Sequence, residues 1–456
     1  MPYKTDKMLS LRKIFYILGC FSLVTAVSLF FTLEKAEAVP SFARQTGYAC
    51  TACHFNGFGP ALNSFGRVFK LLGYTLGKPN KIPPVSAMAF GSFTKTDQPQ
   101  NGGAAPNYKE NENFALDQFS IFYAGRIWNK IGAFTQVTWD GVAKQWALDN
   151  TDLRFATTGT LGGKSSVFGI DVNNNPTVQD LWNSTPAWGF PFVSSALAPT
   201  PTASTLIDGG FAQQVVGITA YTMWNNHLYL ELGPYVTLPS KFQDITGIEP
   251  EGENRIHGVA PYWRVVLQHN WRGNYISAGT IGLLSWVYPG RETSAGSDRY
   301  LDLGLDATYQ YTGFKNLVIS INSLFIKEFQ NLPASQQLGN SSNSSNSLET
   351  LNTNLTLSLY TTFTLIASYF QTTGSTDIGL YSGSANGSPD SNGYILELSY
   401  TPFGKTNSFM SPYANMRVGI QYTGYWKFDG ASSNYDGSGR NAADNNTLYL
   451  YLWWAI

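Results

Sequence analysis

The sequence predicts an all-β protein, a closed antiparallel barrel of about sixteen strands that spans an outer membrane. Charged residues make up 13% of the 456 residues, against about 25% in an average soluble domain. Aromatic residues reach 15%, and no apolar run after residue 40 approaches the roughly 20 residues of a membrane-spanning helix. Few charges and many aromatic residues without helical spans are typical of membrane-spanning strands.

Alternation of apolar and polar residues supports the same fold. The run 301–311 has Leu, Ala or Tyr at every odd position and Asp, Gly, Thr or Gln between them. The runs 228–233 and 417–422 alternate in the same way. One apolar face toward lipid and one polar face toward the lumen is the two-residue period of a membrane barrel. A soluble β-sandwich or propeller is the alternative fold for such alternation.

The connections between the candidate strands alternate in length. Short turns such as 225–226 and 312–313 alternate with long stretches such as 97–112 and 424–446. Barrels of this kind keep their short turns on the periplasmic side and their long loops outside. The longest connection, residues 174–212, could narrow the mouth of the barrel as a constriction or pack as a surface loop. The candidate strands begin near residues 85, 114, 131, 147, 164, 213, 227, 259, 274, 300, 315, 350, 363, 393, 413 and 447.

Residues 1–38 are expected to form a signal peptide that is cleaved after export to the outer membrane. Four Lys or Arg residues precede an apolar run over 14–33, and Ala36-Glu37-Ala38 has the small-x-small pattern of a cleavage site. A membrane anchor is the alternative, because the apolar run is long for a signal. The formal net charge of −1 does not support nucleic-acid binding, so we expect no nucleic-acid partner.

A short motif after the leader predicts a covalent cofactor. Cys50, Cys53 and His54 lie in the run Cys-Thr-Ala-Cys-His, the attachment signature of one c-type haem. Each thiol can add across one haem vinyl group, and the histidine can give the iron its proximal ligand. An isolated Cys-x-x-Cys could instead form a disulfide, a redox pair or half of a zinc site. The adjacent histidine and the export signal favour haem.

Residues 39–81 form the predicted haem segment, and residues 82–456 form the barrel. The run from Pro60 to Leu72 predicts a helix that begins with proline and is followed by Gly73 as a cap. Its apolar residues fall on one face at helical spacing, a face that can pack on the haem ring. The segment is too short for a core of its own, so we expect it to lie within the barrel. The apolar face contains Leu62, Phe65, Phe69 and Leu72.

Further residues are candidates for the haem site. Arg44 and Arg67 are candidate partners of the haem propionates, because a guanidinium group pairs with a carboxylate through two hydrogen bonds. Met88 shares the register of Ser86 and Ser92 on the first strand, which predicts that its side chain faces the lumen. It is the candidate sixth ligand of the iron, and a methionine ligand raises the haem potential. Met223, His227, His257 and His269 remain open alternatives, as does an iron without a sixth ligand.

Charged residues recur at positions that we expect to face the lumen. We favour the interpretation that they form a charge network that lines and plugs the pore. The alternative is that the acidic members attract a small cation such as Fe²⁺, since carboxylates are suitable ligands for hard cations. These residues are Asp152, Arg154, Glu231, Arg264, Asp302, Asp306, Glu397 and Arg417.

The tract from Val39 to Tyr74 resembles the fused porin–cytochromes, the single-haem outer-membrane iron oxidases of iron-oxidising bacteria. The resemblance lies in Pro-Ser-Phe-Ala-Arg-Gln-Thr-Gly at 40–47, the haem motif, Ala-Leu-Asn-Ser-Phe-Gly-Arg at 61–67, and Gly73-Tyr74. The rest of the chain agrees only in layout. The resemblance implies a protein in outer-membrane lipid that takes electrons from extracellular Fe(II). It passes them through its haem to a periplasmic c-type cytochrome or another electron carrier.

The leading hypothesis is therefore an Fe(II)-oxidising electron-transfer protein whose haem segment plugs the barrel. One alternative is a conduit that runs outward and reduces extracellular acceptors. Another is a diffusion porin in which the haem segment is only a plug or sensor. A haem peroxidase would need an open iron site and a distal acid–base residue, and no such residue can be assigned from the sequence.

Overall fold

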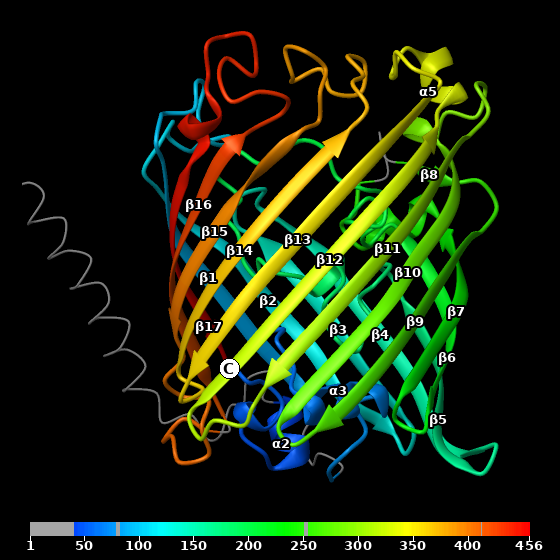
Figure 1. The fold of residues 1–456 in the computed structure, drawn as a ribbon, viewed down its shortest axis with the longest axis vertical. Coiled ribbons are helices and arrows are strands. Elements are labelled where there is room, and N and C mark those ends of the chain that lie inside the picture. Colours follow the sequence, from blue (N-terminus) through cyan, green and yellow to red (C-terminus); the bar gives the residue numbers. More distant parts are fainter. Residues whose placement is uncertain (1–40, 79–82, 250–253, 412) are drawn as a thin grey trace, which may run out of the picture. The chain divides into compact units, whose positions relative to one another are not determined.

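Seventeen strands form one antiparallel sheet that closes on itself into a barrel (Figure 1). The computed structural model describes residues 41–78, 83–249, 254–411 and 413–456, so the expected signal peptide lies outside the described residues. The first strand, β1, pairs with both β2 and the last strand, β17. Closure leaves no edge with unpaired backbone groups, as a membrane-spanning sheet requires.

One strand is a short addition at an end of the barrel, and the other sixteen form the wall that the sequence predicts. The short strand, β8 (Arg255–Ile256), pairs with the end of β10. The wall strands are β1 (Val85–Thr96), β2 (Asn113–Trp128), β3 (Ile131–Asp140), β4 (Gln145–Leu161), β5 (Lys164–Asn173), β6 (Val215–Trp224), β7 (Leu228–Thr237), β9 (Ala260–Trp271), β10 (Asn274–Tyr288), β11 (Asp298–Tyr311), β12 (Leu317–Asn331), β13 (Ser345–Leu359), β14 (Phe363–Gly374), β15 (Ser391–Tyr400), β16 (Asn415–Lys427) and β17 (Thr447–Ala455).

The largest shift from the expected strand starts is in β13, which begins at Ser345 instead of near residue 350. The Ser- and Asn-rich stretch before it therefore belongs partly to the strand. Its backbone continues the ladder with β12, where Ser345 lies opposite Asn331. Polar side chains do not prevent this pairing, because the ladder is made by backbone groups.

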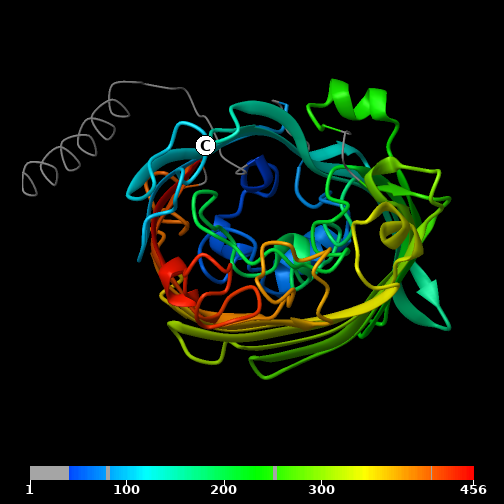
Figure 2. The ribbon, with the colours of Figure 1, turned by 90° about the horizontal axis from the view of Figure 1, so that it is seen from above.

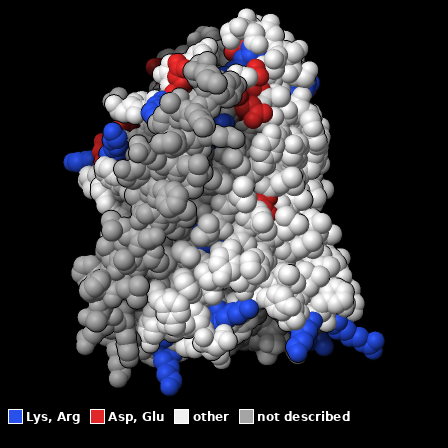
Figure 3. Space-filling model, turned by 90° about the vertical axis from the view of Figure 1, so that its left-hand side faces the viewer, with Lys and Arg blue, Asp and Glu red and all other residues white. Residues whose placement is uncertain are grey.

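The two faces of the wall differ as the alternation predicts. On β11, Leu303 and Leu305 are 39% and 63% exposed on the outside, whereas Asp302 and Asp306 are buried in the lumen. Charged side chains gather near the two ends of the face in Figure 3 and are sparse between them. An apolar belt around a polar interior identifies an outer-membrane type of barrel.

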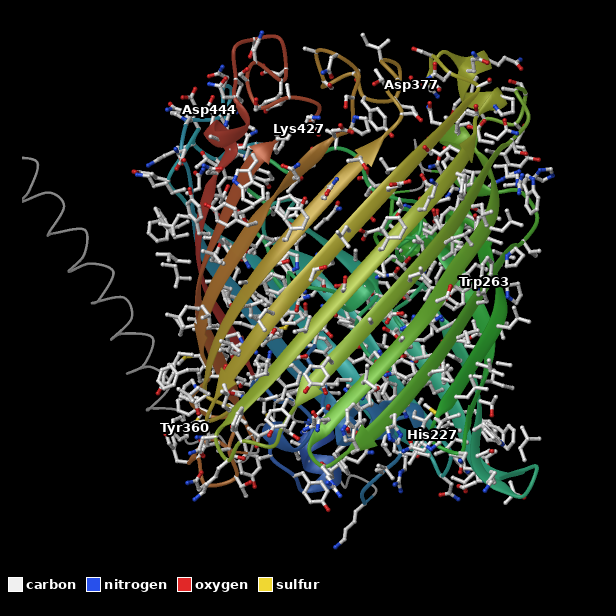
Figure 4. The ribbon with its side chains drawn as sticks, in the orientation of Figure 1. His227, Trp263, Tyr360, Asp377, Lys427 and Asp444 are labelled. Atoms are coloured by element: carbon white, nitrogen blue, oxygen red, sulfur yellow. The ribbon has the colours of Figure 1, made fainter. Side chains whose placement is uncertain are left out.

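The two ends of the barrel carry different connections (Figures 1 and 4). Short turns such as 225–227 and 360–362 lie at one end, called here the turn end, and long loops lie at the other, called the loop end. His227 and Tyr360 mark the turn end in Figure 4, Asp377, Lys427 and Asp444 mark the loop end, and Trp263 lies on the wall between them. The connection 401–414 is the exception, a long segment at the turn end that contacts the N-terminal segment.

The described helices are short. The elements α2 (Ser41–Thr46), η1 (Cys50–Ala52) and α3 (Ser64–Leu71) precede the barrel. Elsewhere there are η2 (Pro186–Trp188), α4 (Ser240–Ile245), η3 (Pro289–Arg291), α5 (Pro333–Leu338) and η4 (Ala442–Asn445). In the part of the chain that the structure describes, no helix is long and apolar enough to cross a membrane.

The predicted helix from Pro60 to Leu72 is too long at its start. Helix α3 begins at Ser64 because the Asn63 side chain caps it, accepting hydrogen bonds from the amides of Phe65 and Gly66. Leu62 instead forms an isolated antiparallel bridge with His54. The end agrees with the prediction, since Gly73 follows with the left-handed φ of 64°.

The N-terminal segment, residues 41–78, lies inside the turn end of the barrel, as expected (Figure 2, blue). Wall residues bind its backbone directly. Asn415 donates to the Gly57 carbonyl at 3.0 Å, Ser358 donates to the Phe55 carbonyl at 2.7 Å, and Tyr221 donates to the Leu71 carbonyl at 2.8 Å. Three strands far apart in the sequence thus hold the segment in place, and packing inside the barrel replaces the core that the segment lacks.

The connection 174–212 also enters the lumen, so the surface-loop interpretation is wrong. Val178, Asp180 and Leu181 are almost fully buried, and Figure 2 shows this connection (green) inside the ring of strands. Trp182 packs against Tyr229 of β7, with ring centroids 5.4 Å apart. The connection therefore acts as the internal constriction that was one of its two interpretations.

Candidate functional site

The Cys-Thr-Ala-Cys-His motif folds into one tight turn. The amides of Cys53 and His54 both donate to the Cys50 carbonyl, at 3.1 and 2.9 Å. Asn63 binds this turn as well as capping α3, because its side-chain amide donates to the Ala52 carbonyl at 2.9 Å. Both cysteines are free thiols, so the disulfide interpretation receives no support.

Glycine allows helix α3 to lie directly against this turn. A Cβ atom at Gly66 would come within 2.6 Å of the Cys53 carbonyl oxygen and 2.9 Å of the Leu62 side chain. Contacts below 3.0 Å force one partner to move, so any side chain at Gly66 would push the helix away from the motif. The sequence predicts the helix, but this close approach is a property of the tertiary structure.

A cavity of about 520 Å³ lies beside the motif and is lined by Cys50, Cys53 and His54. Its volume falls within the roughly 300–1,000 Å³ of known ligand and cofactor pockets. Phenylalanine and tryptophan rings from the segment, the wall and the internal connection line it. These rings are Phe42, Phe58, Phe69, Phe90, Phe122, Phe134, Trp188, Phe192 and Trp453.

Burial sets the protonation of the motif. It lowers the pKa of His54 to about 4, so the imidazole is neutral near pH 7, the form that binds metal ions. Its Nδ1 atom has no hydrogen-bond partner among the described residues. Burial also raises the pKa of the Cys50 thiol and raises that of Cys53 to about 12. Two neutral thiols and one neutral imidazole therefore face the same cavity and could hold a cofactor.

Met88 lines the same cavity as His54. It lies on β1, is 7% exposed and packs in a cluster that includes Phe58, Phe90 and Trp453. The prediction that its side chain faces the lumen is confirmed, and its thioether is available to a group bound beside His54. Its role as an iron ligand stays a prediction.

The other candidate sixth ligands lie elsewhere. Met223 is buried in a separate cluster with Trp182 and Tyr229. His227 and His269 are exposed at the turn end, with ring centroids 5.6 Å apart, and His257 stacks near Tyr288. None of these four side chains lines the cavity. The structure thus brings Met88 together with the motif and leaves the alternatives apart.

The two arginines assigned to propionates hold the segment in place. Arg67 donates to the Leu62 carbonyl at 2.9 Å and to Gln310 at 3.1 Å, and its guanidinium lies 3.7 Å from the centroid of the Tyr275 ring. Arg44 donates to the Val85 carbonyl. Neither side chain lines the cavity, so their pairing with propionates stays a prediction that these contacts do not support.

Sequence reasoning missed three polar groups on the cavity wall. Asp117 sits on a bulge of β2 opposite Phe90 and Gly91, and Asp149 sits on a bulge of β4. Bulges turn side chains out of the regular alternation and are frequent at functional sites, and no pattern of single residues indicates them. The third group is the Trp453 indole, whose N–H has no partner among the described residues although Trp453 is 7% exposed.

Buried ion pairs lie in the lumen, as expected for a charge network that lines it. Arg154 contacts Asp152 at 2.7 Å and Asp171 at 3.1 Å, and Arg264 contacts Asp180 at 3.3 Å and also pairs with Asp306. Arg417 instead holds the backbone carbonyls of the N-terminal segment at Asn56 and Phe58. The network therefore serves partly to anchor the segment.

Lys70 and Asp180 join the N-terminal segment to the internal connection. The Lys70 ammonium donates to the carbonyls of Val178 and Asp180, at 2.8 and 2.6 Å, and to the Asn183 side chain at 2.9 Å. Burial lowers the pKa of Lys70 to about 7. Burial raises the pKa of Asp180, but Arg264 and Lys70 outweigh it and leave the pKa below its ordinary value. Hydrogen bonds thus join the N-terminal segment and the connection 174–212 into one unit inside the lumen.

The described residues contain no group of three or more His, Cys, Asp or Glu side chains placed to hold a metal ion. The half-zinc-site interpretation of the motif therefore lacks its remaining ligands within 41–78, 83–249, 254–411 and 413–456. Cys50, Cys53, His54 and Met88 are the residues that could hold a cofactor in this cavity.

Comparison with known proteins finds a likeness in fold. No family model and no curated protein matches the sequence. An anion-selective porin from Comamonas acidovorans is 10% identical, with a TM-score of 0.46 over 82% of this chain and 98% of that chain. The trimer form of OmpT from Vibrio cholerae is 8% identical, with a TM-score of 0.43 over 82% and 98%. The channel DcaP of Acinetobacter baumannii is 8% identical, with a TM-score of 0.43 over 82% and 96%.

Proposed function

We propose that the protein is an outer-membrane monohaem c-type cytochrome fused to a porin-like barrel. In this proposal it takes electrons from extracellular Fe²⁺ and passes them to a periplasmic cytochrome or similar carrier. The observation that carries the proposal is one cavity lined by Cys50, Cys53, His54 and Met88, inside a barrel whose lumen also holds the connection 174–212. The resemblance of the 39–74 tract to fused porin–cytochromes supports the same assignment.

The residues of the cavity fit a c-type haem. Cys50 and Cys53 offer two thiols for covalent attachment, and His54 offers a neutral imidazole whose Nδ1 has no partner among the described residues. Met88 offers a thioether from the barrel wall. When bound, a haem c supplies a one-electron Fe(III)/Fe(II) couple. Aromatic rings around these groups would give a bound haem ring an apolar surface to pack on.

The electron balance requires a donor and an acceptor, which in this proposal lie on opposite sides of the membrane. Each extracellular Fe²⁺ loses one electron and leaves as Fe³⁺, and a periplasmic carrier removes that electron. The wall of the cavity carries the Asp117 and Asp149 carboxylates, and the two carboxylate oxygens of Asp117 have no hydrogen-bond partner among the described residues. Negative charge on this wall favours the approach of a cation over that of an anion.

The filled lumen favours an electron conduit over a diffusion porin. Residues 41–78 and the connection 174–212 together occupy the lumen and bind each other through Lys70. A porin needs a continuous aqueous channel, whereas electron transfer needs only a bound redox centre. Purified protein in a planar bilayer should therefore show little ion conductance. Conductance typical of an open porin would favour the diffusion porin.

The decisive experiment mixes purified, detergent-solubilised holoprotein with Fe²⁺ at acidic and neutral pH. Reduction of the haem would be followed by its absorption spectrum, together with a redox titration. We expect the haem to be reduced by Fe²⁺. If ferrous iron leaves the oxidised haem unchanged at every pH, the iron-oxidase assignment fails. A potential too low to accept electrons from Fe²⁺ would favour the outward conduit instead.

Matched methionine variants test the sixth ligand. Met88→Ala should lower the haem potential and change the low-spin spectrum, because a thioether ligand raises the potential. Met223→Ala is the control, since Met223 is also buried but lies in another cluster. Equal spectra and potentials in the Met88→Ala variant and the wild type would remove Met88 as a ligand. His54→Ala should lose the normal low-spin spectrum in either case.

A further inference from the structure

The turn end of the barrel carries a concentration of positive charge, called here the basic rim. Its exposed members lie on five separate segments, and three half-buried members add to them. Figure 3 shows Lys and Arg, without Asp or Glu, along the lower edge of the face outside its grey area. The exposed members are Lys78, Lys130, Lys164, Arg272 and Lys315, and the half-buried ones are Arg44, Arg126 and Lys405.

No carboxylate opposes these charges in the described turn-end segments. Those segments contain no Asp or Glu at all. Lys130 donates to the Thr157 hydroxyl at 2.7 Å, and Arg126 donates to the Gly77 carbonyl at 2.7 Å. The acid-free segments are 41–78, 126–132, 161–166, 224–229, 270–275, 311–317, 359–364 and 400–411.

The loop end shows that this composition is not general in the protein. There, surface cations pair with acids, as in Lys95–Glu112 at 2.8 Å and Lys427–Asp390 at 2.8 Å. Further acidic residues on the loops have no counterpart at the turn end. They include Asp97, Glu110, Asp244, Glu292, Asp436 and Asp444. The chain therefore separates charge along the barrel axis and leaves the rim as a positive field facing one side of the membrane.

The N-terminal segment contributes both to the basic rim and to the lining of the cavity. Thr46, Tyr48 and Ala49 line the cavity together with Cys50, and Tyr48 is 54% exposed. Arg44 and Lys78 belong to the same segment, so this segment carries positive charge as well. A redox partner that contacts Tyr48 would come as near to the cavity as the surface of the segment allows.

We propose that the basic rim is the docking surface for a soluble electron-transfer protein with an acidic face, seated over Tyr48. The inference rests on the proposed function, because the docked protein would be the acceptor that removes the electron from the haem. Charge complementarity raises association rates by about 10- to 1,000-fold and weakens with salt. It also suits a transient partner, since redox encounters use small interfaces, below about 1,200 Å². Anionic lipid headgroups are the competing occupant and are an outcome of the test.

The test compares two triple variants of the full holoprotein in detergent. The rim variant carries Lys78→Glu, Lys130→Glu and Lys315→Glu. The control variant carries Lys109→Glu, Lys144→Glu and Lys241→Glu, three exposed lysines at the loop end. All six lysines are surface residues that do not line the cavity. Haem content and redox potential, measured first, should match the wild type in both variants.

The probes are two small soluble acceptors of opposite charge, an acidic plastocyanin and a basic mitochondrial cytochrome c. Stopped-flow spectroscopy would follow oxidation of the pre-reduced haem by each. At low salt we expect the rim variant to react with plastocyanin at least about tenfold more slowly than the wild type. It should react no more slowly with the basic cytochrome. The control variant should behave as the wild type, and the difference should shrink above 0.15 M salt, where the screening length is about 8 Å.

The proposal is overturned if plastocyanin reacts equally fast with the wild type and the rim variant. It is also overturned if the rim variant loses only binding to vesicles of phosphatidylglycerol, because the rim would then be a lipid site. Binding of redox-inactive zinc plastocyanin, measured by sedimentation, separates docking from the proposed function. Rim-dependent binding without any covalent haem would retain the docking surface and reject the cytochrome. Haem reduction by Fe²⁺ without rim-dependent binding would retain the cytochrome and reject the docking surface.

Discussion

The turn end and the loop end of the barrel are stabilised by different means, although the same strands reach both. At the turn end, wall side chains such as Asn415 and Arg417 hold the backbone of an internal segment, and the described surface carries no acids. At the loop end, side chains hold loops to one another, as Asp377 holds Ser341 and Asn346. Strand pairing sets the wall, whereas the connections decide the chemistry of each end.

The two ends therefore have different roles. The turn end encloses a cavity and positions the thiols and imidazole of residues 50–54 to face it. The loop end offers a polar, acid-rich surface. Buried ion pairs centred on Arg154 and Arg264, called here the floor, lie in the lumen. Each of the following variants tests one part of this contrast, in order of decreasing expected effect.

The largest effect is expected from Arg264→Met in the floor. It leaves the Asp180 and Asp306 carboxylates buried without their guanidinium partner, which costs about 3–5 kcal/mol for a buried pair. Urea unfolding should show this loss, and planar-bilayer recordings should show new conductance. Lys327→Met is the matched control, since the Lys327–Glu349 pair is exposed and such pairs contribute about 0–1 kcal/mol. Equal losses in the two variants would contradict an electrostatic floor.

The next effect is expected from Gly57→Ala at the turn end. Gly57 has φ +81°, and a Cβ atom there would lie 2.6 Å from the Thr361 carbonyl oxygen. The left-handed backbone alone costs roughly 1–2 kcal/mol for alanine, and the contact displaces the motif turn as well. Gly437→Ala at the loop end is the control, with φ +79° and only an ordinary 3.5 Å contact.

Both glycine variants would be compared by thermal unfolding and by the amount of covalent haem that the proposed function requires. We expect both to lose stability because of the strained backbone, and only Gly57→Ala to lose covalent haem. If Gly437→Ala lowers haem content as much as Gly57→Ala, the close packing of the segment against the 360–362 turn is not what positions the motif.

A smaller effect is expected from removing helix caps at the two ends. Asn63→Ala removes the cap of α3 and its hydrogen bond to Ala52, and Asn441→Ala removes the capping box of η4 at the loop end. Each cap contributes about 1 kcal/mol. The haem absorption spectrum should change only in Asn63→Ala, and proteolysis of the 428–446 loop should increase only in Asn441→Ala. The same spectral change in both variants would mean that the ends are coupled.

The smallest effect concerns acid resistance of the loop end. Burial raises the pKa of Asp377, but hydrogen bonds from Ser341, the Ser342 amide and Asn346 outweigh it and hold the pKa well below its ordinary value. A depressed carboxyl pKa contributes stability above the unfolded value of about 3.9, and that stability is lost as pH falls through the lower folded value. The loops should therefore keep their hydrogen-exchange protection at pH 3.

Asp377→Asn tests whether the ionised Asp377 carboxylate stabilises the loops, because asparagine carries no charge at any of these pH values. The variant should lose protection in residues 341–346 at pH 5 to 7 as much as at pH 3. The N-terminal segment should keep its protection, since it is at the turn end. Protection that falls steeply in the wild type between pH 5 and pH 4 would contradict the depressed pKa.

Local pattern was sufficient for much of this protein. The two-residue period of apolar side chains predicts the wall strands, because each strand must present one face to lipid and one to the lumen. The alternation of short and long connections predicts that the barrel has one end with short turns and one end with long loops. The adjacency of Cys50, Cys53 and His54 places three reactive groups on one turn without any tertiary information, and the start of β1 predicts that Met88 faces inward.

Only the closed barrel decided which of these groups meet. Cavity walls come from β1, β2, β3, β4 and β17, and the two ends of the chain's strand order become neighbours when β17 pairs with β1. Closure places Met88 beside the motif and Met223 in another cluster, brings Arg67 to Leu62 and Gln310, and adds Trp453 from the last strand. The bulges at Asp117 and Asp149 arise from register between paired strands. Sequence alone thus determines faces and local turns, whereas contacts depend on pairing across long sequence separations.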